Sequence, residues 1–203
     1  MTVKSAVRTV AAIGIAVVTL GACGLPGESA PTFYYLLDPI DPAAERQAGG
    51  AVSLALEPVE IPAYLDRQAL VTRSDDNELE VASFHQWAEP LYANVTRVLA
   101  ENLRLLLDQT DVVRLPSRNS GFNAELQVEL MRFERAADGP VTLVARWRVL
   151  DGRGQRELAS RRAVVQEPLD GAGPEATVAA MDRALAELSR RIAEHLREAG
   201  AAI

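Results

Sequence analysis

The stretch VTLVARWRVL, residues 141–150, alternates apolar side chains with other residues along most of its length. Every second residue of the stretch is apolar, and these are Val141, Leu143, Ala145, Trp147 and Val149. Arg146 and Arg148 fall on the opposite face. A period of two is typical of a strand with one face buried. The stretch therefore predicts a long strand in a sheet that is covered on one side.

Two further long strands are expected on either side of it. Residues 124–133 carry Leu126, Val128 and Leu130 on one face, after which Met131 and Phe133 continue the apolar set on the opposite parity. That change of parity predicts a β-bulge. The turn DGRG, residues 151–154, predicts a hairpin into a strand over residues 157–166.

The first half of the chain contains shorter strand candidates, bounded by Pro, Gly, Asp and Asn. They cover residues 33–37, 52–56, 68–73, 78–82 and 111–115. The segment SDDN, residues 74–77, predicts a hairpin between the third and fourth of them.

Two helices are predicted by apolar residues at spacings of three and four. The first is expected over residues 89–109, with Pro90 in its opening turn, where a missing N–H costs nothing. Its stripe is Leu91, Val95, Val98, Leu99, Asn102 and Leu106. The second is expected over residues 174–198. Together these elements predict an α+β fold, with antiparallel sheets and two main helices packed on one face.

The beginning of the chain is typical of a bacterial lipoprotein. Lys4 and Arg8 precede an apolar run over residues 10–20, which is too short to span a bilayer. The run ends in Leu-Gly-Ala-Cys23, a lipobox, and Cys23 is the only cysteine of the chain. We therefore expect a signal peptide over residues 1–22, an acylated Cys23 with an N-acyl chain such as palmitate, and a Pro- and Gly-rich tether to residue 32. Residues 33–203 are then one periplasmic domain.

Charge limits the partners of this domain. The formal net charge is −7 at pH 7, and removal of the signal peptide, with its two basic residues, makes the chain more acidic. An acidic chain without a basic block argues against nucleic acid and against electrostatic attraction to anionic lipid. The acyl chains would then supply the membrane contact. Gly24, rather than aspartate, follows Cys23 and favours the outer membrane.

No catalytic residues, metal ligands or cofactor are predicted. The Gly-containing turns are not a dinucleotide fingerprint. His85 is expected to cap or pack at the first helix, and His195 to lie as a cation near the end of the second helix. The arginine pairs 146/148 and 161/162 could bind an anion or a phospholipid head group, but cross-strand pairing with acidic neighbours such as Glu157 or Glu129 is the preferred interpretation.

The segment from residue 61 to residue 103 resembles the ABC-type transport auxiliary lipoprotein family, the PqiC/YmbA-like group. The resemblance lies in the turn IPAYLDR at residues 61–67, the strand containing VTR at 71–73, and WAEPL at 87–91, which opens a helix. The segment YYLLD at residues 34–38, after the lipobox, also fits this family.

This resemblance implies a non-catalytic auxiliary subunit of an MCE-type lipid transporter, whose partners would be a periplasmic MCE-domain protein and an inner-membrane ABC permease with its ATPase. Homo-oligomerisation is a further hypothesis. The candidate partner-binding residues are Tyr64, Leu65, Asp66, Arg67, Trp87 and Leu91. The same residues can instead specify the fold. A structural envelope lipoprotein and a periplasmic lipid carrier remain alternative functions.

Overall fold

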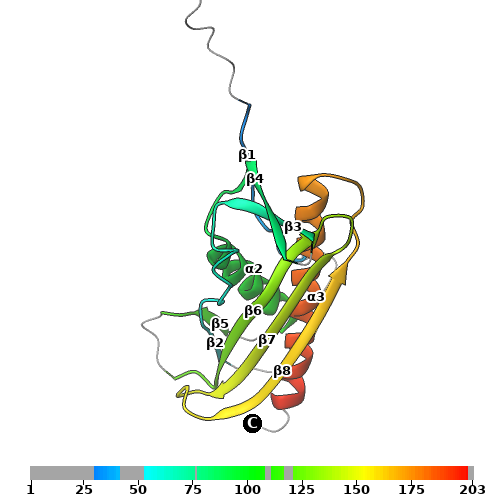
Figure 1. Ribbon diagram of the computed structural model, residues 1–203. Coiled ribbons are helices and arrows are strands. Elements are labelled where there is room, and N and C mark those ends of the chain that lie inside the picture. The colour runs from blue at the N-terminus through cyan, green and yellow to red at the C-terminus, as the bar shows by residue number, and fades with distance from the viewer. Residues whose placement is uncertain (1–29, 42–52, 76, 108–110, 117–120, 201–203) are drawn as a thin grey trace, which may run out of the picture. The chain divides into compact units, whose positions relative to one another are not determined.

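The computed structural model describes residues 30–41, 53–75, 77–107, 111–116 and 121–200. The chain divides into two compact units, Met1–Pro31 and Thr32–Ile203. In the first unit only Ala30 and Pro31 are described, so the predicted signal peptide and Cys23 lie outside the described residues. The second unit contains the fold, shown in Figure 1.

One eight-stranded sheet forms the framework of the second unit. Its strands are β1 (Phe33–Tyr35), β2 (Ser53–Leu56), β3 (Ala69–Asp75), β4 (Glu78–Trp87), β5 (Asp111–Arg114), β6 (Ala124–Ala136), β7 (Val141–Asp151) and β8 (Glu157–Glu167). The long strand β6 is the centre of the sheet: one edge pairs with β7, which pairs with β8, while the other edge pairs with both β2 and β3. β5 continues from β2, and β4 and then β1 continue from β3.

The prediction of antiparallel sheets is wrong, because the sheet is mixed. The three hairpins β3–β4, β6–β7 and β7–β8 are antiparallel, as their short turns require. The pairs β1–β4, β2–β5, β2–β6 and β3–β6 are parallel. Each parallel pair joins strands that are far apart in sequence, and local alternation carries no information about that pairing. The α+β class is confirmed.

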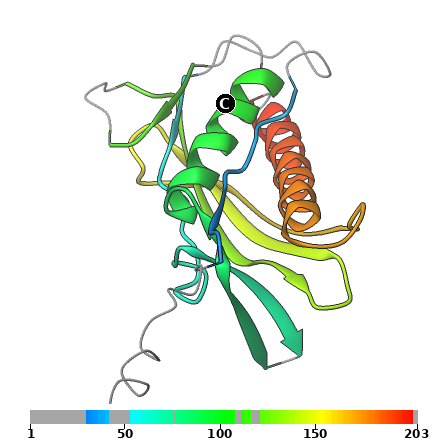
Figure 2. The same ribbon diagram turned by 90° about the horizontal axis from the view of Figure 1, so that it is seen from above.

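Among the described residues, two helices accompany the sheet, α2 (Leu91–Leu106) and α3 (Pro174–Gly200). Pro90 is the N-cap of α2, so the helix begins one residue after the proline rather than before it. The two helices lie against each other on the same side of the sheet (Figure 2), and α3 crosses β7 and β8. Two helices on one face were predicted from the apolar stripes.

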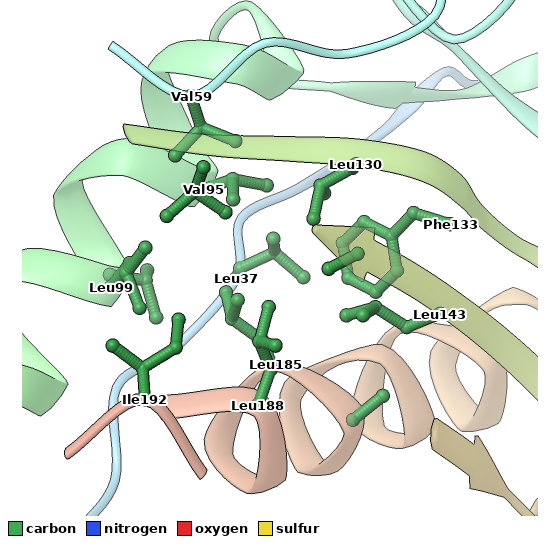
Figure 3. Packing of buried hydrophobic residues seen from close by; sticks show 14 of the residues in the cluster. Leu37, Val59, Val95, Leu99, Leu130, Phe133, Leu143, Leu185, Leu188 and Ile192 are labelled. Atoms are coloured by element: carbon green, nitrogen blue, oxygen red, sulfur yellow. The ribbon is translucent and has the colours of Figure 1, made fainter. Parts of the chain in front are cut away.

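The core lies between this layer of helices and the sheet (Figure 3). Strand residues Leu130, Phe133 and Leu143 meet Leu185 and other buried residues of both helices. The predicted bulge in β6 is confirmed: the register shifts between Leu130 and Arg132, which keeps Phe133 on the buried face. The hairpin over residues 151–154 is also confirmed, and Gly152 is required there because a Cβ atom would collide with the carbonyl oxygen of Phe122.

The segment that follows β1, residues 36–41, runs between α2 and α3, and we call it the strap (Figure 2). It has no sheet partner, so helix side chains accept its N–H groups. Asn94 accepts from Leu37 at 3.2 Å, and Asn102 accepts from Ile40 at 2.8 Å. The amide of Asn102 also donates to Ser189 on α3 at 3.0 Å. These hydrogen bonds connect the strap to both helices.

Candidate docking surface

The predicted partner-binding motif forms a turn between β2 and β3. Its approach runs beside β6, where the N–H of Glu60 donates to Val128 and that of Leu130 donates to Glu60. The turn closes through hydrogen bonds from Leu65 to Pro62, 2.9 Å, and from Arg67 to Leu65, 2.8 Å. Proline at its second residue suits this geometry because φ is already fixed. We call residues 61–67 the docking turn.

The docking turn divides its side chains between core and solvent. Leu65 is buried, and Tyr64 is half-buried with its hydroxyl directed to β6. Asp66 and Arg67 are exposed. They are therefore the two residues of the motif that present charge to a partner without any change in the fold.

Tyr64 belongs to a polar cluster centred on Glu134 of β6, which is fully buried. One carboxylate oxygen of Glu134 accepts from the Tyr64 hydroxyl at 2.7 Å and from the N–H of Phe133 at 3.0 Å. The other oxygen accepts from Nε of both Arg73 and Arg132 at 3.0 Å. A buried carboxylate needs this many donors to offset its desolvation. The cluster thereby attaches the docking turn to β3 and β6.

The electrostatics of the cluster fix its protonation state. Burial by itself raises the pKa of Glu134, but the hydrogen bonds from Tyr64, Arg73, Arg132 and the Phe133 N–H outweigh it, so the pKa is lowered. Burial, together with the hydrogen bond to Glu134, raises the pKa of Tyr64 to about 12. Glu134 therefore stays an anion and Tyr64 stays protonated at neutral pH. A carboxylate and a phenol so held suit a structural brace rather than proton transfer.

Trp87 and Leu91 lie at the junction of β4 and α2, and both are buried in the core. The N–H of Trp87 donates to Gln68 at 2.6 Å, and the N–H of Ala88 donates to Tyr35 at 2.9 Å. These bonds fix the junction from both sides. In the folded domain, then, Trp87 and Leu91 offer a partner almost no surface, and we base no docking contact on them.

Sequence reasoning missed Glu134 as the centre of the cluster. Its only signal is the parity change after Leu130: a glutamate that follows a bulge can lie where alternation no longer predicts exposure. His85, to which the sequence assigns no site role, also has a specific contact, since its Nδ1 lies 2.8 Å from the Tyr35 hydroxyl. The same hydroxyl donates to Glu175 at the start of α3, at 3.0 Å.

Two arginines of the outer sheet face, Arg146 and Arg148, have acidic or polar partners across the strands. Arg146 donates to Glu129 at 2.7 Å, and Arg148 donates to Gln127 at 2.8 Å. For Arg146, cross-strand pairing is therefore the better of the two expectations. His195 is not the cation expected at a helix end: burial and Arg161 lower its pKa, and its Nδ1 accepts from the indole N–H of Trp147 at 2.9 Å.

The described residues offer no candidate metal cluster and no helix that could span a membrane. None of their His, Cys, Asp and Glu residues gather in a group of three or more that could hold a metal ion. None of the helices in that part of the chain is long and apolar enough to cross a membrane.

Comparison with known proteins identifies the family. The family model of the ABC-type transport auxiliary lipoprotein component matches residues 35–193. The chain therefore belongs to the ABC-type transport auxiliary lipoprotein family. As a member it is a lipid-anchored protein of the cell envelope and an auxiliary component of ABC-type transport systems. Among the curated proteins, no sequence matches significantly.

Solved structures share the fold. A crystal structure of an uncharacterized protein is 23% identical, with a TM-score of 0.70, and the match covers 82% of this chain and 99% of that one. Protein XCC0632 from Xanthomonas campestris is 19% identical, with a TM-score of 0.68 and coverage of 83% and 97%. The hypothetical protein CT253 from Chlamydia trachomatis is 13% identical, with a TM-score of 0.50 and coverage of 76% and 100%.

Proposed function

We propose that this protein is a non-catalytic accessory lipoprotein of an MCE-type lipid transport system, which docks the periplasmic MCE protein at the outer membrane and supports membrane integrity. The observation that carries the proposal is the family match over residues 35–193. In this scheme acylated Cys23 holds the domain at the bilayer. The permease and ATPase of the same system lie in the inner membrane.

The docking turn supplies the contact in this proposal. Its exposed Asp66 and Arg67 have opposite charges, and the Tyr64–Glu134 hydrogen bond holds the turn against β6. A turn held in one conformation loses little entropy on binding, and adjacent opposite charges specify the orientation of a partner. The hydrogen-bonded Glu134 cluster, which holds the turn, and the exposed Asp66 and Arg67 on the turn favour protein docking over catalysis.

Lipid carriage is the main competing function, and the packing of the core argues against it. A carrier needs an apolar cavity, whereas Leu and Val side chains from sheet and helices fill the layer between them. An open cleft of about 550 Å³ beside β5 is lined by Arg104, Asp111 and Arg114 as well as apolar residues, which does not suit an acyl chain. A structural envelope lipoprotein is the second alternative.

The test is an affinity purification of the acylated protein from mildly solubilised envelopes, with proteins and lipids identified by mass spectrometry. We expect an MCE-domain protein and no stoichiometric phospholipid on the purified domain. Stoichiometric phospholipid without that partner would establish a carrier. Cell-wall material without that partner would establish a structural lipoprotein.

A matched pair of charge reversals tests the docking turn. Arg67→Glu should recover several-fold less MCE protein, because it replaces one charge of the exposed pair. Arg153→Glu reverses another exposed arginine, in the β7–β8 turn, and should leave recovery unchanged. Equal recovery with both variants would place the interface elsewhere on the domain.

A further inference from the structure

Exposed apolar side chains gather at one end of the domain. Seven large hydrophobic residues are exposed in the described part of the chain, and five of them belong to β1, the residue after it, and β4. We call these five the apolar end: Phe33, Tyr34, Leu36, Val81 and Phe84. Their exposed fractions run from 43% for Val81 to 64% for Tyr34. Such a concentration of apolar surface marks a contact surface.

The apolar end exposes both faces of a ribbon rather than one. β1 and β4 pair in parallel, with Phe33 opposite His85 and Tyr34 opposite Gln86. Phe33 stacks on the His85 ring, with 5.3 Å between ring centroids. Tyr34, the next residue along an extended strand, points to the other face. A protein partner with a flat interface would cover only one of these faces, whereas lipid can surround the ribbon and cover both.

The apolar end is also where the chain arrives from the predicted anchor. Nine residues, 24–32, separate Cys23 from Phe33. At about 3.5 Å per residue they span at most about 30 Å, so an acylated Cys23 keeps this end of the domain near the bilayer. The strap, which follows β1 and begins with Leu36, is fixed between the helices by Asn94 and Asn102. Phe33 and Tyr34 therefore cannot move far from the domain.

Charge decides which part of the bilayer this end suits. The hairpin of β3 and β4 carries Asp75, Glu78 and Glu80, so anionic headgroups do not attract it. Tyr and Phe favour the boundary between headgroups and acyl chains, where a ring is in apolar surroundings and a hydroxyl reaches water. Contact would therefore rest on shallow burial of aromatic rings in a weakly charged leaflet.

We propose that the apolar end inserts into the headgroup–acyl boundary of the bilayer in which Cys23 is anchored, as a second membrane contact that orients the domain. This proposal rests on the acylation of Cys23 contained in the proposed function. Two signals together give stable and oriented attachment, whereas an acyl anchor on a tether alone leaves the domain free to rotate.

A spin-label experiment on the full acylated protein tests this insertion. Phe84→Cys and Val164→Cys introduce thiols at matched exposure, 45% and 47%, on β4 and on β8. Because Cys23 is the only native cysteine and its sulfur would be a thioether, the label reacts at the new thiol alone. The labelled proteins are placed in vesicles of phosphatidylethanolamine and phosphatidylcholine. Accessibility to apolar oxygen and to a water-soluble nickel chelate is then measured.

We expect oxygen accessibility relative to the chelate to be several-fold higher at residue 84 than at residue 164. Water-like values at both positions would overturn the proposal. Shielding of residue 84 from both reagents would mean that protein, such as a second copy, covers it, and would overturn the proposal equally. Tyr34→Cys provides a second position if Phe84→Cys fails to fold.

The intact mass of each labelled protein distinguishes failure of the insertion proposal from failure of the acylation on which it rests. If the mass includes the acyl groups and residue 84 has water-like accessibility, only the insertion proposal is contradicted. A mass without acyl groups contradicts the anchor, and both proposals then fail together.

Discussion

Glu134 is the residue on which the docking turn depends most. Glu134→Gln keeps the shape of the side chain but replaces one acceptor oxygen with a donor and removes the charge that faces Arg73 and Arg132. We expect a loss of about 2–3 kcal/mol in the free energy of unfolding at pH 7, reduced from the value for a fully buried pair because both arginines reach water. Urea denaturation measures the loss.

Glu129→Gln is the control, since Glu129 pairs with Arg146 at an exposed position. It should cost less than about 1 kcal/mol. The difference between wild type and Glu134→Gln should depend on pH. Because the pKa of folded Glu134 is lowered, its contribution is present above the unfolded pKa and is lost as the pH falls through the folded pKa. If the difference does not depend on pH, the Glu134 carboxylate does not stabilise the fold as a buried anion, and the prediction fails.

Asp182 gives the opposite pH dependence. This carboxylate of α3 accepts from the N–H of Asp38 in the strap at 3.0 Å, and burial raises its pKa to about 7. Between the unfolded pKa, about 3.9, and about pH 7 the folded state binds more protons, so stability falls as the pH rises across that window. Asp182→Asn removes the charge and keeps the acceptor. We expect it to stabilise the protein by about 1 kcal/mol at pH 8, and to have little effect near pH 4.

Thermal unfolding at both pH values measures this change. Asp170→Asn is the control, because Asp170 is largely exposed and pairs with Arg183. It should change stability little at either pH. If Asp182→Asn instead destabilises the protein at pH 8, the ionised carboxylate stabilises the strap by more than its burial costs. That result would contradict the prediction.

At the scale of elements, the strap and the two helices form one unit through Asn102. Its amide bonds Ile40 of the strap and Ser189 of α3, and the residue is fully buried. Asn102→Ala leaves a buried N–H of the strap without an acceptor, which should cost about 2–3 kcal/mol. Ser189→Ala removes the bond from Asn102 and the hydroxyl's own bond to the Leu185 carbonyl, but keeps the strap bond, and should cost about 1 kcal/mol. Urea denaturation compares them, and equal losses would show that the strap bond contributes nothing.

Asn102 also shows how far the sequence predicts these elements. Its spacing from Leu99 and Leu106 places it on the buried stripe of the first helix, and it is buried there. The periodicity cannot reveal why an asparagine lies in that stripe, because its partner Ile40 is 62 residues away and belongs to no regular element. Local patterns predict which face is buried. They do not predict which distant backbone needs an acceptor.

The candidate docking surface has the same limit. The motif at residues 61–67 predicts a turn, and a turn is present with Asp66 and Arg67 exposed. Trp87 and Leu91, four residues apart, suggest a common apolar surface, but both are buried in the core, at a junction that is bonded to Gln68 and Tyr35. Spacing along the chain does not encode these distant neighbours. The parallel strand pairs were missed for a related reason. Strand direction depends on long connections, whose path is not contained in any short window.

At the scale of the whole molecule, the membrane attachment that we propose has two unequal parts. The acyl chains bury many methylene groups, each contributing about 0.8 kcal/mol, whereas the apolar end offers five partly exposed side chains. A chain exported with an ordinary secretory signal and beginning at Gly24 keeps the apolar end but lacks the anchor. We expect it in the soluble periplasmic fraction, while the wild-type protein sediments with membranes. Immunoblots of both fractions measure the distribution.

The same truncated chain separates anchoring from folding. Its described domain is unchanged in sequence, so its thermal unfolding should match that of the acylated protein in detergent, because the two chains share every described residue, including those of the strap and the core. Addition of Tyr34→Ser to the acylated protein should leave it in the membrane fraction, since one ring contributes far less than the acyl chains. If the chain beginning at Gly24 still sediments with membranes after a high-salt wash, the apolar end or a membrane partner holds the domain there, and the acyl anchor is not the main attachment.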